Sequence, residues 1–180
     1  DTEVFRLGQS FWPDEILQPG LPADLVGKWS ICRLPRPAWQ ARRSNLPLEQ
    51  SFYVASYRSA VDESRDYILL DGFNGASRNP YHTFDILELR LAGRTILEGY
   101  HNQVLTSADG MVEPAVAMDA ALLSSDVLGS TAIAVGEVPG AAFCNWRRTL
   151  CQRTGRYALV VDDLAFRTDS RNMNVTTTWQ

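Results

Sequence analysis

The stretch Thr83-Phe-Asp-Ile-Leu-Glu-Leu-Arg-Leu91 decides the fold class, because its residues alternate between two faces. One predicted face holds Asp85, Leu87, Leu89 and Leu91, and the other holds Phe84, Ile86, Glu88 and Arg90. A period of two over this length is typical of a β-strand with one buried side. The following Ala92-Gly93 predicts a tight turn into Thr95-Ile-Leu97, so the whole stretch is interpreted as a β-hairpin.

Further strands are predicted on both sides of this hairpin, at 28–34, 51–57, 67–70, 131–138, 143–150, 157–166 and 173–179. Thr154-Gly155 predicts another hairpin turn, and 157–161 is apolar on both faces, as in a central strand. Only 118–128 has a helical pattern. Many short strands separated by turn residues predict an all-β protein, an antiparallel β-sandwich.

The proline content divides the chain into two regions. Six of the nine prolines fall in the first fifty residues, which disfavours long helices there. We expect 1–50 to be a proline-rich N-terminal extension packing on the sandwich, and 51–180 to form the sandwich core. Because the sequence begins at Asp1 and stops on a β-rich stretch, we interpret the 180 residues as one domain, a fragment of a larger protein.

Composition excludes several classes of function. The 21 acidic residues outnumber the 17 basic ones, giving a net charge of −4, so there is no general nucleic-acid footprint. No apolar run reaches the roughly 18 residues that a membrane-spanning helix needs. The three cysteines (Cys32, Cys144 and Cys151) have no metal-site spacing and are interpreted as packed free thiols.

A loop-like segment, 71–82, leads directly into the hairpin and is rich in Gly and Asn. Loops anchored to a rigid sheet are where binding groups concentrate. The chain has only two histidines, His82 at the end of this loop and His101 beyond the hairpin, which limits the designs of a histidine-based site. The predicted substrate-binding residues are the polar ones around these histidines: Asn74, Arg78, Asn79, Asp85, His101 and Asn102.

Three roles are open for this group. Tyr81 and His82 are the candidate catalytic residues if the site deprotonates a sugar acid whose carboxylate Arg78 holds in a bidentate contact. Alternatively, His82, Asp85 and His101 are ligand types suited to a divalent metal such as zinc, although our main expectation is a site without a cofactor. The third role is an ordinary hydrogen-bonded loop in which Asp85 accepts from backbone donors.

The tryptophans have two interpretations, as platforms on which sugar rings stack or as core anchors. Trp29 and Trp146 have apolar neighbours and are predicted to lie in the core. Trp12 and Trp39 lie among prolines and are the better candidates for an exposed surface. For Trp179, near the end of the chain, both interpretations stay open.

The sequence from Tyr81 to Leu97 resembles the strand hairpin of heparinase II/III-like polysaccharide lyases, in which a histidine-rich loop leads to an Asp, an alternating strand and a Gly-Arg turn. Residues 145–150 (NWRRTL) and 155–164 (GRYALVVDDL) resemble a later hairpin of the family's C-terminal β-sandwich domain. Asp85 matches the motif Asp. The family's histidines lie two and four residues before it, where this chain has Thr83 and Tyr81 with His82 between them.

The resemblance implies the β-sandwich domain of a polysaccharide-degrading, lyase-like protein that contacts an acidic polysaccharide. The reaction it implies is β-elimination, in which a carboxylate is neutralised, the C5 proton is removed and the leaving oxygen is protonated. The family's helical domain is absent from these 180 residues, so activity is expected together with other domains of a parent chain, in the periplasm or outside the cell. Neither nucleic acid nor a membrane is an expected partner. The alternative is a non-catalytic scaffold or interaction module whose apolar face packs against a partner domain.

Overall fold

The computed structural model describes residues 26–33, 46–47, 49–62, 64–73, 83–99, 102–111, 119–167, 169 and 172–179. In this part of the chain every regular element is a β-strand, and the strands pair antiparallel. The strands are β1 (Trp29–Arg33), β2 (Phe52–Arg58), β3 (Tyr67–Asp71), β4 (Ile86–Leu91), β5 (Arg94–Glu98), β6 (Val104–Ala108), β7 (Ala121–Leu128), β8 (Thr131–Ala141), β9 (Cys144–Arg153), β10 (Tyr157–Phe166) and β11 (Met173–Thr177). The prediction of an all-β, antiparallel protein is confirmed.

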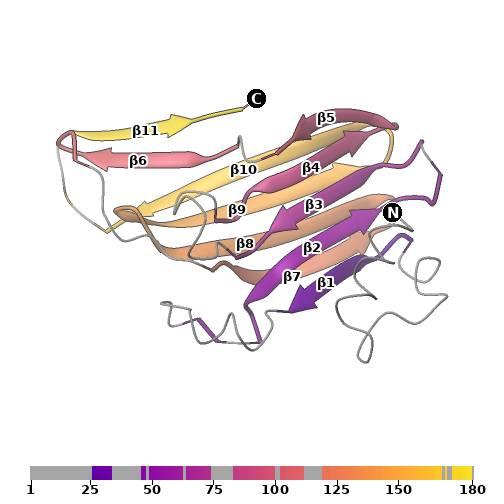
Figure 1. The fold of residues 1–180 in the computed structure, drawn as a ribbon, viewed down its shortest axis with the longest axis horizontal. Helices are drawn as coiled ribbons and strands as arrows, with labels where there is room; N and C mark the ends of the chain where they lie inside the picture. The colour runs from indigo at the N-terminus through magenta and orange to yellow at the C-terminus, as the bar shows by residue number, and fades with distance from the viewer. Residues whose placement is uncertain are drawn as a thin grey trace.

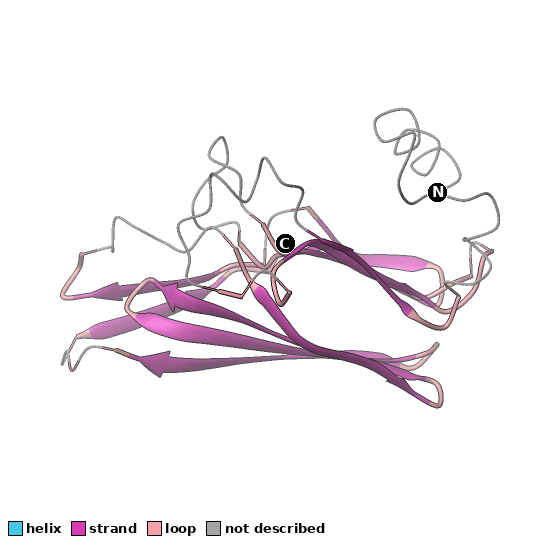
Figure 2. Cartoon of the chain, turned by 90° about the horizontal axis from the view of Figure 1, so that it is seen from below, coloured by secondary structure: helices cyan, strands magenta, loops and turns pink. Residues whose placement is uncertain are grey.

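The strands form two larger sheets and a two-stranded one. The five-stranded sheet has the order β1-β2-β3-β4-β5 and the four-stranded sheet the order β10-β9-β8-β7, so strands that follow one another in the chain are neighbours in each sheet. The two sheets lie in separate layers, one over the other, in the side view of Figure 2. The third sheet, β6 with β11, lies at one end of the layers (Figure 1). Of the proline-rich extension expected for 1–50, residues 1–25, 34–45 and 48 lie outside the described part of the chain.

The core fills the space between the two layers, and Phe84 is at its centre. Its ring meets Phe52 of the five-stranded sheet edge to face, with centroids 6.1 Å apart, and Trp146 of the four-stranded sheet at 5.8 Å. A Cβ atom added at Gly136 in β8 would lie only 2.2 Å from the Cζ atom of Phe84. The sequence therefore places a glycine where the opposite sheet must accommodate this ring.

The predicted core residues are partly confirmed. Trp146 is buried, and Trp29 is half-buried against the core. The three cysteines are free thiols: Cys144 is buried and Cys151 is half-buried, but Cys32 is exposed, so the prediction of packing is wrong for Cys32.

The helix predicted for 118–128 is wrong, because the described part of this segment forms strand β7. Its Ala and Leu content favours a helix locally, but pairing with β8 overrides that preference. Leu123 has no partner in the register between Leu122 and Ser124, which marks a β-bulge. The bulge interrupts the period of two by which a strand is recognised.

The hairpin predicted for 83–97 forms as β4 and β5, but the alternation of its side chains differs from the prediction. The strand begins at Ile86 and not at Thr83, and the register with β3 skips Leu87 as a bulge. Ile86 and Leu89, predicted on opposite faces, are therefore both buried in the core. Phe84, just before the strand, has a φ of 68°, a left-handed conformation uncommon for such a side chain.

Strand β10 is not the predicted central strand. Among the described strands it is the edge of its sheet, with β9 as its neighbour. Its alternate side chains Tyr157, Leu159 and Val161 are 48%, 52% and 48% exposed. The apolar sequence thus produces one face in the core and one apolar face in solvent.

A single carboxylate joins hairpin turns of the two sheets. Asp66 is 1% exposed and accepts from the backbone N–H of Ala92, in the β4–β5 turn, and of Gly155, in the β9–β10 turn, both at 2.7 Å. Each turn has a glycine with positive φ, Gly93 at 75° and Gly155 at 65°, as predicted for Ala92-Gly93 and Thr154-Gly155. Asp66 therefore fixes the layers to each other at this end of the molecule.

Candidate functional site

The structure describes two of the residues predicted for the site, Asp85 and Asn102, and both are completely buried. The other six, whose roles stay predictions, lie outside the described residues: Asn74, Arg78, Asn79, Tyr81, His82 and His101. We refer to 74–82 and 100–101 as the two histidine segments. Their described flanking residues show where in the fold each segment begins and ends.

Both ends of segment 74–82 are anchored between the layers. The residues before and after the segment are joined directly, because the backbone N–H of Asp71 donates to the backbone oxygen of Asp85 at 2.9 Å. The backbone oxygen of Gly72 accepts from the N–H of Ala120 at 2.8 Å, which attaches this end to the start of β7. The segment therefore leaves β3 and returns before β4 at the same point of the fold.

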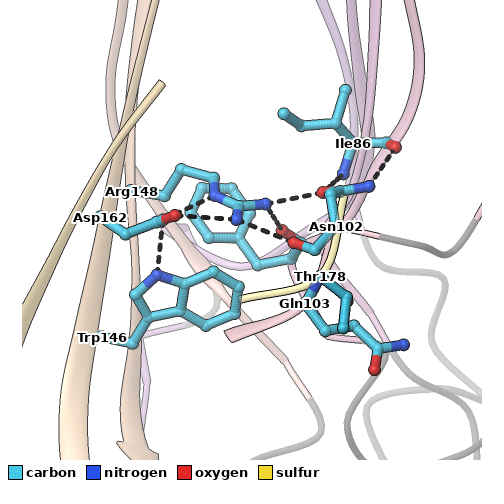
Figure 3. Close-up of polar contacts among 8 residues, drawn as sticks. Ile86, Asn102, Gln103, Trp146, Arg148, Asp162 and Thr178 are labelled. Carbon is cyan, nitrogen blue, oxygen red and sulfur yellow. Dashed lines mark hydrogen bonds and ion pairs between the residues drawn. The ribbon is translucent and has the colours of Figure 1, made fainter. Parts of the chain in front are cut away.

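Asn102 attaches the second histidine segment to the same place. Its side-chain oxygen accepts from the backbone N–H of Ile86, and its side-chain NH₂ donates to the backbone oxygen of Ile86, both at 2.8 Å (Figure 3). The amide thus pairs with the first residue of β4 as a neighbouring strand would. The ends of both histidine segments converge next to residues 85 and 86.

A buried arginine of the four-stranded sheet connects these flanking residues to the opposite layer. Arg148 of β9 is 0% exposed and donates to the backbone oxygen of Phe84 at 3.2 Å, to the side-chain oxygen of Asn102 at 2.8 Å and to its backbone oxygen at 2.9 Å. The remaining donors reach the two carboxylate oxygens of Asp162 at 2.7 and 3.1 Å (Figure 3). These five hydrogen bonds match the five N–H donors of a guanidinium group.

Asp162 has a second buried partner in Trp146. The indole N–H donates to the same carboxylate oxygen that accepts from Arg148 Nε, at 2.8 Å. The Arg148 guanidinium carbon lies 4.7 Å from the centre of the Trp146 ring, a cation–π distance. We call Arg148, Asp162, Asn102 and Trp146 the Arg148 cluster. Its charges and donors satisfy one another, and its hydrogen bonds join β9 and β10 to Phe84, Ile86 and Asn102.

Trp179 is the aromatic residue that borders this cluster and remains accessible. Its side chain is 47% exposed, and its ring centre lies 5.6 Å from the Arg148 guanidinium carbon. The backbone N–H of Thr178 donates to the backbone oxygen of Gln103 at 3.1 Å, and this places Trp179 beside the end of segment 100–101. Trp12 and Trp39, the predicted exposed tryptophans, lie outside the described residues.

Reasoning from the sequence missed the Arg148 cluster, although a signal for part of it is present. With the β9–β10 turn at Thr154-Gly155-Arg156, residue 153 faces 157, and the same register places Arg148 opposite Asp162. Opposite charges at facing positions of a hairpin predict a pair. The contacts to Asn102 and Phe84 join the two layers, and no local pattern predicts them.

The comparisons with known proteins do not assign this chain to a family. No family model, no curated protein and no solved structure matches it. Within the residues that the structure describes, no three His, Cys, Asp or Glu side chains form a group that could hold a metal ion. That same part contains no helix of the length and apolar character needed to span a membrane.

Proposed function

We propose that this chain is the β-sandwich domain of a lyase-like, polysaccharide-degrading protein and contacts an acidic polysaccharide through its two histidine segments. The observation that carries the proposal is the convergence of three features at one place. The ends of segments 74–82 and 100–101 meet beside Asp85 and Ile86, and the half-exposed Trp179 lies next to them. An accessible indole beside loops rich in hydrogen-bond donors is a suitable surface for a sugar chain.

The sequence assigns chemistry to these segments. Arg78 would neutralise a uronate carboxylate through a bidentate contact, and His82 and Tyr81 would remove the C5 proton and protonate the leaving oxygen. The Arg148 cluster supports this assignment because it fixes the anchor points of both segments against β9 with buried hydrogen bonds. Other domains of a parent chain would complete the catalytic cleft, so binding, not turnover, is the property to test on this chain.

Isothermal titration calorimetry with uronic-acid oligosaccharides tests the proposal. An acidic oligosaccharide is expected to bind, a neutral glucan of the same length to bind less, and His82→Ala to weaken the acidic ligand. Trp179→Ala is expected to weaken binding about tenfold, as loss of one stacked aromatic does, and Trp179→Phe to restore most of it. Leu128→Ala is the matched control, since Leu128 is 62% exposed on β7, outside the histidine segments. Equal affinity of all these variants, or no binding at all, contradicts the proposal.

A second function, as a non-catalytic interaction module, is favoured by one observation. The outward face of the four-stranded sheet exposes large apolar side chains, among them Leu128, Leu159 and Val161. Exposed apolar surface of this kind is typical of protein-protein contacts. A module of this kind would bind a protein partner in the absence of any oligosaccharide, and substitutions at Trp179 would leave that binding unchanged.

A further inference from the structure

Strand β10 differs from the other outer strands of the two larger sheets. The pairings of β1 with β2, β5 with β4 and β7 with β8 each contain a register shift. The β10–β9 pairing runs without a shift from Tyr157 to Phe166. Bulges and edge charges are the usual protection of an edge strand, yet β10 contains no bulge or proline, and the stretch from Tyr157 to Val161 carries no charge. Among the outer strands of the two larger sheets, it is the one best suited to accept another strand.

The outward side chains of β10 are complementary to themselves. In an antiparallel pairing of two copies centred on Leu159, Leu159 faces its own copy and Tyr157 faces Val161. All three are about half-exposed in one copy. On the inner face, Ala158 would face Val160 in the same register, and these two residues already pack against the core of their own chain. Registers centred on Val160 or Val161 instead place Tyr157 or Leu159 opposite Asp163, so the apolar pattern favours one register.

The charges at the two ends of β10 support the same register. The β9–β10 turn, at one end of the apolar stretch, carries the exposed Arg153 and Arg156. Asp162 and the exposed Asp163 lie at the other end. Pairing about Leu159 places Asp163 opposite Gly155, in the turn that carries the two arginines. Asp162, which would lie opposite Arg156, already pairs with Arg148 and Trp146 of its own chain and does not contribute. A two-fold axis repeats this contact, so a basic turn meets an acidic strand end twice.

We infer that a second copy of this chain binds at the edge of β10, so that two four-stranded sheets join into one continuous sheet across a two-fold axis. The backbone groups of two edge strands supply the hydrogen bonds of such an interface. Tyr157, Leu159 and Val161 supply its apolar contacts, and the Arg156 and Asp163 ends set its register. This inference is independent of the proposed polysaccharide site, which lies at the histidine segments.

Sedimentation equilibrium of the 180-residue chain, over about 5 to about 500 μM, tests the inference. The chain, of 20.1 kDa, is expected to show reversible association that ends at twice this mass. Leu159→Lys should raise the dimer dissociation constant at least ~10-fold, because two like charges would face each other on the axis. The matched control is Leu128→Lys, which adds the same charge to the same sheet at β7 and should leave the dissociation constant unchanged.

Charge reversal tests the register without relying on the apolar substitution. Asp163→Arg and Arg156→Asp should each weaken the dimer, and the double variant should recover most of the loss because it restores opposite charges. Circular dichroism on each variant checks that the fold persists. A chain that stays monomeric throughout the concentration range overturns the inference. So does association that Leu159→Lys and Leu128→Lys affect equally, or a double variant no better than the single ones.

Discussion

The Arg148 cluster leads to a quantitative prediction for the variant Arg148→Met. Methionine keeps much of the volume of the arginine stem but removes all five hydrogen bonds of the guanidinium. Asp162, whose side chain is 14% exposed, retains the Trp146 donor but loses its ion partner. The backbone oxygens of Phe84 and Asn102 lose donors in the buried space between the layers.

The size of the effect follows from these losses. Removing one partner of a buried ion pair costs about 3–5 kcal/mol, because an uncompensated charge stays behind. A buried acceptor left without a donor costs about 1–3 kcal/mol, but such terms overlap and do not add. We therefore expect Arg148→Met to lower the free energy of unfolding by about 4 kcal/mol, a large part of the roughly 5–15 kcal/mol typical of a domain.

The adjacent arginine provides a matched control. Arg147 lies on the outer face of the same strand, its side chain is 52% exposed, and it pairs with Glu137 at 2.8 Å. Screening by water limits such a pair to about 1 kcal/mol or less, so Arg147→Met should change stability little.

Urea unfolding followed by tryptophan fluorescence measures both variants. A second measurement of Arg148→Met in an Asp162→Asn background should give a smaller loss, by about 1.5 kcal/mol or more, since no stranded carboxylate remains. The reasoning is refuted if Arg148→Met costs no more than Arg147→Met, or if the loss is the same in both backgrounds.

Three further predictions concern the fold around this cluster. Asp66→Ala removes the acceptor for the backbone N–H groups of two hairpin turns and should lower the free energy of unfolding in urea by about 3 kcal/mol. A loss under about 1 kcal/mol would contradict the role of Asp66 as a link between the layers. Gly136→Ala should lower the free energy of unfolding by about 1–3 kcal/mol, because the new methyl group would overlap the buried Phe84 ring. An unchanged unfolding midpoint would contradict this, since it would mean that the Phe84 ring moves aside without loss of stability. Burial, and then the charge of Glu88, raises the pKa of Tyr67, so its neutral form stabilises the folded state. This contribution is fully present below the unfolded pKa of about 10 and is lost as pH rises through the higher folded pKa. Unfolding free energies measured across this range should therefore fall more steeply for the natural chain than for Tyr67→Phe, and parallel curves would contradict the shift.

Most strands were predictable because they carry local signals. Period-two alternation and turn residues such as Ala92-Gly93 and Thr154-Gly155 identify both hairpins, and the structure places glycines with positive φ in both turns. Strand β7 was missed because its Ala and Leu residues favour a helix and a bulge at Leu123 disrupts the alternation. Strand β6 was missed as well, and its buried Thr106 hydroxyl donates to the backbone oxygen of Ala142, a contact formed only in the folded chain.

The location of the candidate site along the chain stays a prediction, and the contacts of its flanking residues could not be predicted from the sequence. Histidines and Asn-rich loops direct attention to 74–82 and 100–101, and the described flanking residues of these segments converge. The contacts that hold them, from Arg148 to Phe84 and Asn102, join residues 64 and 46 positions apart in the sequence. Packing of the two layers produces these contacts, and neither propensity nor spacing within one strand can reveal them.

The most direct test of the account is a nuclear magnetic resonance titration of the labelled chain with a uronic-acid oligosaccharide. We predict that amide signals of Asn102 and Gln103 and the indole signal of Trp179 shift in a saturable way, while signals from the outward face of β7 to β10 stay in place. No shift, or shifts confined to that outward face, would contradict the proposal that the histidine segments contact an acidic polysaccharide.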